Sequence, residues 1–161
     1  MPTTAIKTIY YTKTQSAPIS LHPSTKMSTL PTIPAVLIGI TRTTALSSSI
    51  DLFTGTPYSI AAVLDLHEAP EKYQFSLSNL GTVLYALHPR PRILGTGTAI
   101  EAEMVEEIES VWGEHVGRVE GRCCWVALSK THGRPGPPPP GIGEEVMRQL
   151  DAVFRPEVKH S

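Results

Sequence analysis

The segment at residues 91–112, PRILGTGTAIEAEMVEEIESVW, constrains the fold of this chain more than any other stretch. Residues 92–95 are typical of a short strand, and a Gly-Thr-Gly-Thr turn follows. Apolar residues then recur at helical spacing over residues 99–112, which predicts an amphipathic helix. A strand that leads into a helix through such a turn is the basic step of an α/β sheet. The apolar stripe consists of Ile100, Met104, Val105, Ile108, Val111 and Trp112.

The same strand–helix step recurs before and after this segment. The apolar run AVLIGI at residues 35–40 is typical of a strand buried on both faces. Strands that alternate with helices form a parallel sheet through right-handed crossovers. We therefore predict an α/β fold with a small four-stranded parallel sheet, strand order 2-1-3-4, and helices on both faces. Strands are expected at residues 35–40, 58–66, 92–95 and 122–128, and helices at residues 44–54, 76–87, 99–112 and 141–154.

The beginning of the chain has a different composition from the rest. Residues 1–33 are rich in serine, threonine and proline, and residues 1–50 contain no acidic side chain. Such a segment buries too little apolar surface to form a core, so we predict a disordered leader. The acid-free start also fits a mitochondrial targeting peptide, although the leader lacks arginine, and Met27 is a second candidate for the first residue. The folded domain is expected at residues 34–155, with a polar tail at residues 156–161.

Charge and cysteine content narrow the class of protein. The chain has 161 residues, 40 % of them hydrophobic, and a formal net charge of −1. This charge argues against general attraction to nucleic acid or to anionic membranes. No apolar stretch approaches the roughly 20 residues of a membrane-spanning helix. The two cysteines, Cys123 and Cys124, are adjacent on a predicted strand and therefore point to opposite faces, so we expect reduced thiols in a cytoplasmic protein.

Three loops are predicted to meet at one edge of the sheet. In a doubly wound sheet, ligands bind beyond the carboxyl ends of the strands, where the strand order reverses. Two cations, several hydroxyls and helix N-termini would converge there, and these groups hold phosphate or carboxylate. The same threonines and glycines also serve as helix caps and turn residues, and Thr43 or Thr44 is the expected N-cap of the first helix. The candidate ligand-binding residues are Arg42, Thr43, Thr44, Gly95, Gly97, Thr98 and Lys130.

Specific catalytic and cofactor motifs are missing from the sequence. The turn after the first strand, GITRTT, lacks the G-x-G-x-x-G of dinucleotide-binding folds, and no G-x-x-x-x-G-K-[ST] phosphate loop occurs. The G-x-S-x-G turn of hydrolases is also missing. Asp65 stands where an acid binds ribose in dinucleotide folds, but without the accompanying glycines. The histidines lack metal-ligand spacing, so we predict no metal site and identify neither a cofactor nor a catalytic residue.

Three stretches of the chain resemble a group of small fungal proteins that have a Rossmann-like, flavodoxin-like fold. The stretches are PAVLIGITRTT, RILGTGTAIEAEMVEEI and GPPPPGIGEEVMRQLDAVF, and they lie within residues 34–154. The resemblance implies the fold and a fungal origin. It carries over no catalytic residue, because no activity is implied for the group.

Two hypotheses of function follow from these observations. The missing motifs favour a non-catalytic interaction or accessory domain that keeps the fold without its chemistry. The alternative is a small-molecule binding protein or enzyme that holds an anionic ligand, bearing phosphate or carboxylate, at the carboxyl edge of the sheet. The sequence leaves open the ligand, the protein partner and whether the chain is a monomer or a homo-oligomer.

Overall fold

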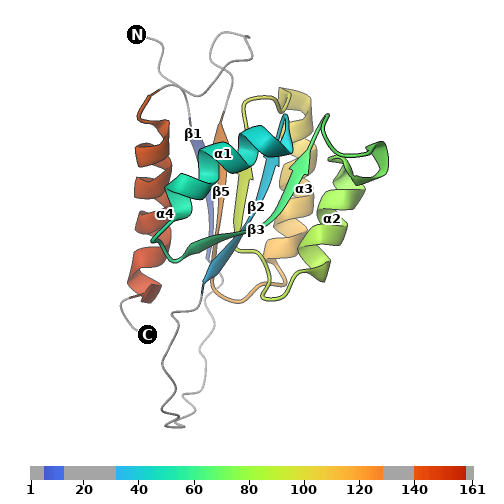
Figure 1. Cartoon of the computed structure of the whole chain (residues 1–161). Coiled ribbons are helices and arrows are strands. Elements are labelled where there is room, and N and C mark those ends of the chain that lie inside the picture. The colour runs from blue at the N-terminus through green and yellow to red at the C-terminus, as the bar shows by residue number, and fades with distance from the viewer. Residues whose placement is uncertain (1–5, 13–31, 129–139, 159–161) are drawn as a thin grey trace.

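A sheet lies between two layers of helices in this protein (Figure 1). The structure is a computed structural model that describes residues 6–12, 32–128 and 140–158. Within them, the sheet has five strands in the order β1-β5-β4-β2-β3. The strands are β1 (Ile6–Thr12), β2 (Ile33–Gly39), β3 (Tyr58–Asp65), β4 (Ile93–Thr96) and β5 (Arg122–Leu128). The helices are α1 (Arg42–Phe53), α2 (Leu77–Ala86), α3 (Ala102–Val116) and α4 (Ile142–Val158), with a 3-10 turn η1 (Glu71–Tyr73).

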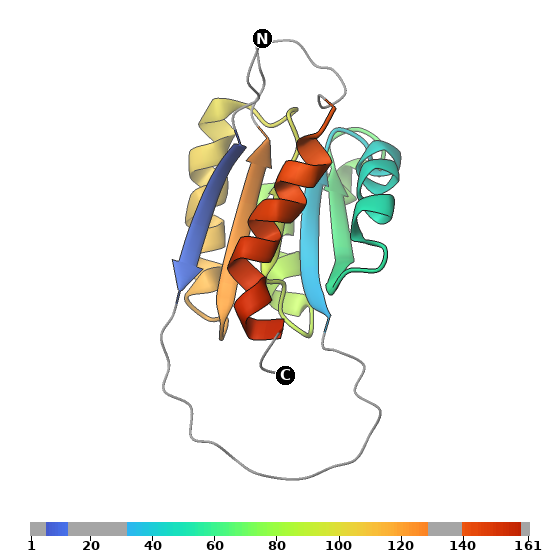
Figure 2. The ribbon, with the colours of Figure 1, turned by 90° about the vertical axis from the view of Figure 1, so that its left-hand side faces the viewer.

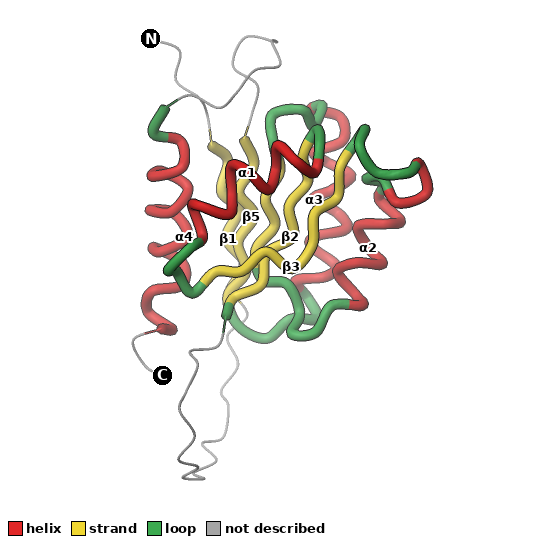
Figure 3. Tube along the Cα trace, in the orientation of Figure 1, coloured by secondary structure: helices red, strands yellow, loops and turns green. Residues whose placement is uncertain are grey.

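The predicted parallel sheet is confirmed. β3, β2, β4 and β5 pair side by side and in parallel, which is the order 2-1-3-4 when β2 is counted as the first strand. The strands β2 and β5 are almost continuously apolar and buried, because helices cover both faces of the sheet. Figure 3 shows the strands as one layer with helices on either side. The topology is compatible with a Rossmann-like fold.

A fifth strand corrects the prediction for the beginning of the chain. Residues 6–12, which we assigned to a disordered leader, form β1 and pair antiparallel with the whole of β5. The segment IKTIYYT is rich in β-branched and aromatic residues, which favour strands. The surrounding serines, threonines and prolines, which are typical of disorder, obscured this strand pattern in the sequence. The other leader residues, 1–5 and 13–31, lie outside the described part, as does part of the predicted tail.

The sheet has a separate apolar core on each face. The helices α2 and α3 cover one face, where Trp112 and Trp125 are fully buried. The helices α1 and α4 cover the other face, where Phe154 is fully buried (Figure 2). Right-handed crossovers that run in opposite directions along a sheet lie on opposite faces, which explains this division. Cys123 belongs to the first core and Cys124 to the second, as expected for neighbours on a strand, and both are free thiols.

Helix ends differ from the predicted bounds by a few residues. The helix α3 begins at Ala102, three residues later than predicted, because the Gly-Thr-Gly-Thr turn continues to Glu101 as its N-cap. The helix α4 runs to Val158 rather than 154, so the predicted tail at residues 156–161 begins with helical residues.

Within the described residues, no helix is both long enough and apolar enough to cross a membrane.

Candidate functional site

Of the three loops that were predicted to meet at the carboxyl edge of the sheet, those that follow β2 and β4 lie together there, and the loop after β5 lies outside the described residues. The two strands are neighbours at the position where the strand order reverses. The backbone N–H of Gly97 donates to the carbonyl of Ile38 over 2.9 Å. A Cβ atom on Gly97 would lie 3.9 Å from Cα of Gly39, so the two loops are in close contact. Residues 42–44 form the first turn of α1, and Thr98 follows Gly97 in the turn after β4.

One candidate residue lies within a strand instead of at this edge, and another lies outside the described residues. Gly95 lies inside β4, and a Cβ atom on it would lie 2.8 Å from Cδ2 of Leu37. Its role is therefore to let the neighbouring strand pack closely rather than to contact a ligand. Lys130 lies outside the described residues, so its convergence with Arg42 stays a prediction.

The N-terminus of α1 is capped by a residue that we did not predict. Thr41 has the extended backbone typical of an N-cap, and its Oγ1 accepts a hydrogen bond from the N–H of Thr44 over 3.1 Å. The predicted N-cap at Thr43 or Thr44 is therefore wrong by two or three residues. As a result, the N–H of Thr44 is already engaged within the helix cap.

A carboxylate of the protein itself occupies the N-terminus of α1. The backbone N–H of Thr43 donates to Glu68 over 2.7 Å, and the Thr43 hydroxyl donates to the other carboxylate oxygen over 2.5 Å. These bonds stabilise the ionised form, so the pKa of Glu68 is lowered, chiefly by the Thr43 hydroxyl. The helix N-terminus also favours negative charge. Glu68 thus holds the position that we predicted for an external anion.

Asp65 holds the loop that carries Glu68. It is the last residue of β3 and is only 2 % exposed. One carboxylate oxygen accepts hydrogen bonds from the backbone N–H groups of His67, Glu68 and Ala69, over 3.1, 2.7 and 2.9 Å. This arrangement is an extended form of the turns that aspartate forms with the backbone two or more residues later. Asp65 therefore organises the loop, and its engaged oxygen is not available to a ribose.

Two side chains on the parallel strands that could carry chemistry, those of Cys124 and Thr96, are buried. Burial raises the pKa of Cys124 to about 12, which suppresses the nucleophilic thiolate. The hydroxyl of Thr96, at the end of β4, accepts a hydrogen bond from Nε1 of Trp125 over 3.0 Å. Within the described part of the chain, no group of three or more His, Cys, Asp or Glu residues is placed to hold a metal ion.

A groove that the sequence did not indicate lies between α2 and α3, near the amino ends of the strands. It has a volume of about 130 Å³. Its residues come from α2, from α3 and the turn that follows it, and from the segment before β4, so the packing of α2 against α3 brings them together. The lining consists of Gly81, Leu84, Tyr85, Arg90, Val111, Glu114, His115 and Arg118.

In comparisons with family models, with curated proteins and with solved structures, nothing matches this chain. The topology alone therefore defines the class of the protein. It is a small doubly wound α/β protein with one added antiparallel edge strand.

Proposed function

We propose that this chain is a non-catalytic interaction or accessory domain. The observation that carries the proposal is the contact between Glu68 and Thr43 at the N-terminus of α1. In doubly wound proteins this edge of the sheet is where ligands bind. Here several of its described polar groups bind other groups of the protein. Asp65 accepts hydrogen bonds from the loop that carries Glu68, and Thr96 accepts one from Trp125. An edge that is engaged in this way favours a fold kept for its surface rather than for chemistry.

The strand β1 offers a suitable surface for a protein partner. All seven of its residues pair with β5, and no described strand pairs with its other side. An edge strand presents backbone N–H and C=O groups that pair readily with a strand from another chain. The only charged residue in the segment IKTIYYT is Lys7, and the segment contains no proline that would block pairing. We expect a protein partner, or a second copy of this chain, to add a strand there.

Two neighbouring proline substitutions test this surface, Ile9→Pro and Tyr10→Pro. In an antiparallel strand, successive N–H groups point to opposite sides, so one of these two faces β5 and the other faces outward. The inward substitution removes a sheet hydrogen bond and is expected to lower the free energy of unfolding by about 1–3 kcal/mol. The outward one is expected to keep stability and to abolish association. Chemical denaturation and sedimentation velocity over a range of concentrations measure the two effects.

The two variants control for each other, because both place proline in the same strand at adjacent positions. A partner complex or self-association that survives the stability-neutral variant would contradict binding at the edge of β1. Loss of association in the destabilised variant alone would also contradict it, because unfolding would then explain the loss.

A second candidate function is the binding of a small anionic ligand at the carboxyl edge, in a binding protein or an enzyme. The observation that favours it is that the N-terminus of α1 already holds a carboxylate, that of Glu68, so this position suits negative charge. In this alternative, a phosphate or carboxylate group displaces Glu68. The residues expected to hold it are Arg42, Thr43, Thr44, Gly97, Thr98 and Lys130.

Thermal shifts of the wild type and of Glu68→Gln distinguish the two functions. The panel contains nucleotides, dinucleotides and organic phosphates. If the domain serves interactions only, we expect no shift in either protein. An anion site predicts a shift that is larger in Glu68→Gln, because the competing carboxylate is neutralised. A ligand at one hundred times its Kd adds about 2.7 kcal/mol of stability, which a melting curve detects readily.

We further propose that the protein acts inside the cell, in the cytoplasm. The free and buried thiols of Cys123 and Cys124 support this, because disulfides are typical of oxidising compartments. Mitochondrial targeting by residues 1–33 is the alternative. A fungal origin rests on the resemblance described above, and the net charge of −1 favours proteins over nucleic acid as partners.

A further inference from the structure

We propose that the groove between α2 and α3 binds a small organic monocarboxylate. Gly81, Leu84 and Val111 give the groove an apolar part, and Arg90, His115 and Arg118 give it a polar part. The groove lies near the amino ends of the strands, whereas the edge that holds Glu68 lies at their carboxyl ends. It is therefore a separate site from the one discussed so far.

The size of the groove suits a ligand with a single ring or a short chain. Its volume of about 130 Å³ is close to that of an engineered protein cavity of about 150 Å³ that binds benzene. Gly81 keeps the α2 wall open. A Cβ atom added there would lie 4.0 Å from Cγ1 of Val111, which fills space without a clash. An acid with a single ring or a short chain fits these dimensions.

The net charge of the groove favours a ligand with a single negative charge. Arg118 is paired with Glu114 over 2.5 Å, and Arg90 lies over the ring of Tyr85 with its Cζ 5.6 Å from the ring centre. Stacking on an aromatic ring leaves the in-plane N–H groups of a guanidinium available to a carboxylate. Two guanidiniums and one carboxylate leave one positive charge in excess, which matches a monocarboxylate better than a phosphate dianion.

The imidazole of His115 is part of the wall. This side chain is only 6 % exposed, and its Nε2 donates to the carbonyl of Pro91 over 2.8 Å, since a carbonyl only accepts. In the neutral ring Nδ1 is then an acceptor, so it donates to a carboxylate only when the imidazole is protonated. Burial lowers the pKa of His115, and the charges of Arg90 and Arg118 lower it further. A bound carboxylate offsets those charges, so binding is expected to raise this pKa and to strengthen as pH falls.

Titration of the full ¹⁵N-labelled chain with benzoate, followed by NMR, tests the proposal. We expect saturable, millimolar binding, with shifts confined to residues 81–91 and 111–118. Benzamide, a neutral molecule of nearly the same shape, and inorganic phosphate are expected to bind at least about tenfold more weakly, because each lacks the matched single charge on an apolar body. The pKa of His115, read from its ring protons, is expected to rise when benzoate is bound.

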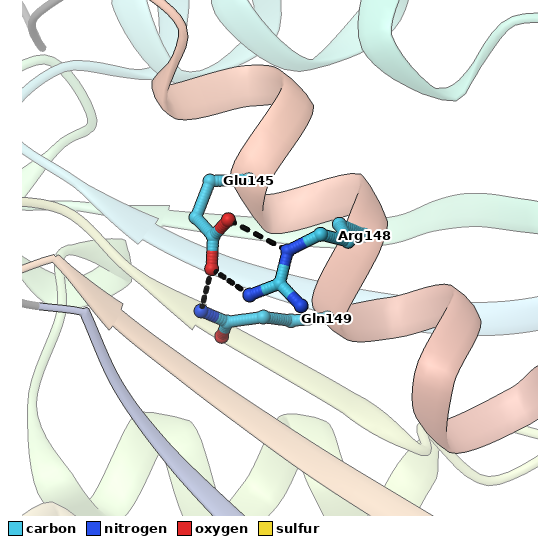
Figure 4. Close-up of polar contacts among 3 residues, drawn as sticks. All are labelled: Glu145, Arg148 and Gln149. Atoms are coloured by element: carbon cyan, nitrogen blue, oxygen red, sulfur yellow. Dashed lines mark hydrogen bonds and ion pairs between the residues drawn. The ribbon is translucent and has the colours of Figure 1, made fainter.

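Substitutions locate the binding in the groove. Arg90→Ala is expected to weaken benzoate binding by about tenfold or more, as for the loss of a hydrogen bond to a charged group. The control for the loss of one arginine side chain is Arg148→Ala. Arg148 lies on the exposed face of α4, where it pairs with Glu145 as Arg118 pairs with Glu114 at the groove, and its side chain is 69 % exposed (Figure 4). The substitution Arg148→Ala removes the same charge at a distance from the groove and is expected to leave benzoate binding unchanged.

If Arg90→Ala does not fold, the variant Gly81→Ala provides a second test of binding in the groove. It adds one methyl group inside the groove and replaces glycine by a better helix former, so we expect a folded protein that binds benzoate more weakly. Equal affinity for benzoate and benzamide would overturn the proposal. Non-saturating shifts, or binding that Arg148→Ala weakens as much as Arg90→Ala does, would overturn it as well.

Discussion

Trp125→Ala is expected to lower the free energy of unfolding by about 3–5 kcal/mol, the usual cost of removing a buried tryptophan. Trp125 is fully buried at the centre of β5, between β1 and β4. Its ring packs in the core beneath α2 and α3, and its Nε1 donates to Thr96 over 3.0 Å. The substitution leaves a cavity and deprives the buried hydroxyl of Thr96 of its donor. Urea denaturation of both proteins measures the difference.

An exposed aromatic residue provides the control for this measurement. Tyr73 lies in η1 and is 60 % exposed, so Tyr73→Ala is expected to change stability by no more than about 0.5 kcal/mol. If Trp125→Ala were as mild as Tyr73→Ala, the position of Trp125 in the core would be wrong, and with it the register of β5 against β4.

Asp65→Ala is expected to cost about 2–4 kcal/mol, because three backbone N–H groups lose the carboxylate oxygen that accepts their hydrogen bonds. The loss should appear first in the loop, as faster hydrogen exchange at the amides of residues 67–69. Equilibrium denaturation gives the size of the effect. Because this loop presents Glu68 to Thr43, the variant is also expected to release the N-terminus of α1.

Asp65→Asn separates the hydrogen bonds from the charge at this position. The amide oxygen of asparagine accepts the same three hydrogen bonds, so the loop should stay ordered and the loss of stability should be clearly smaller. Slow exchange at residues 67–69 in Asp65→Ala would mean that the loop is held by other contacts, against the role that we assign to Asp65.

The parallel sheet was predictable because its signals are local. Each parallel strand is an apolar run followed by a helical stripe, and the handedness of crossovers then restricts the strand order. The stripe that contains Ile108 and Trp112 became the buried face of α3, and the strand at residues 122–128 has the predicted bounds. The strand β1 was missed because its β-branched residues stand in a segment rich in serine, threonine and proline, and because its partner, β5, is distant in the sequence.

The sites were less predictable because they depend on contacts between distant residues. The sequence predicted that Thr43 and Gly97 lie at the same edge of the sheet, since both follow parallel strands. It gave no sign that Glu68, 25 residues after Thr43, would occupy the helix N-terminus. The groove is a stronger example, because Arg90 and Arg118 belong to segments that become neighbours only when α2 packs against α3.

The pairing of β1 with β5 determines which strand lies at the edge of the sheet. A polypeptide that began at Met27 would have no β1, and β5 would become the outer strand of the sheet. The sequence of β5, RCCWVAL, has a charge only at its first residue, Arg122, and no proline, so the rest of the strand lacks the protection that is normal at an edge. A chain shortened in this way would therefore present a more apolar edge than β1, with which a strand from another polypeptide would pair more readily.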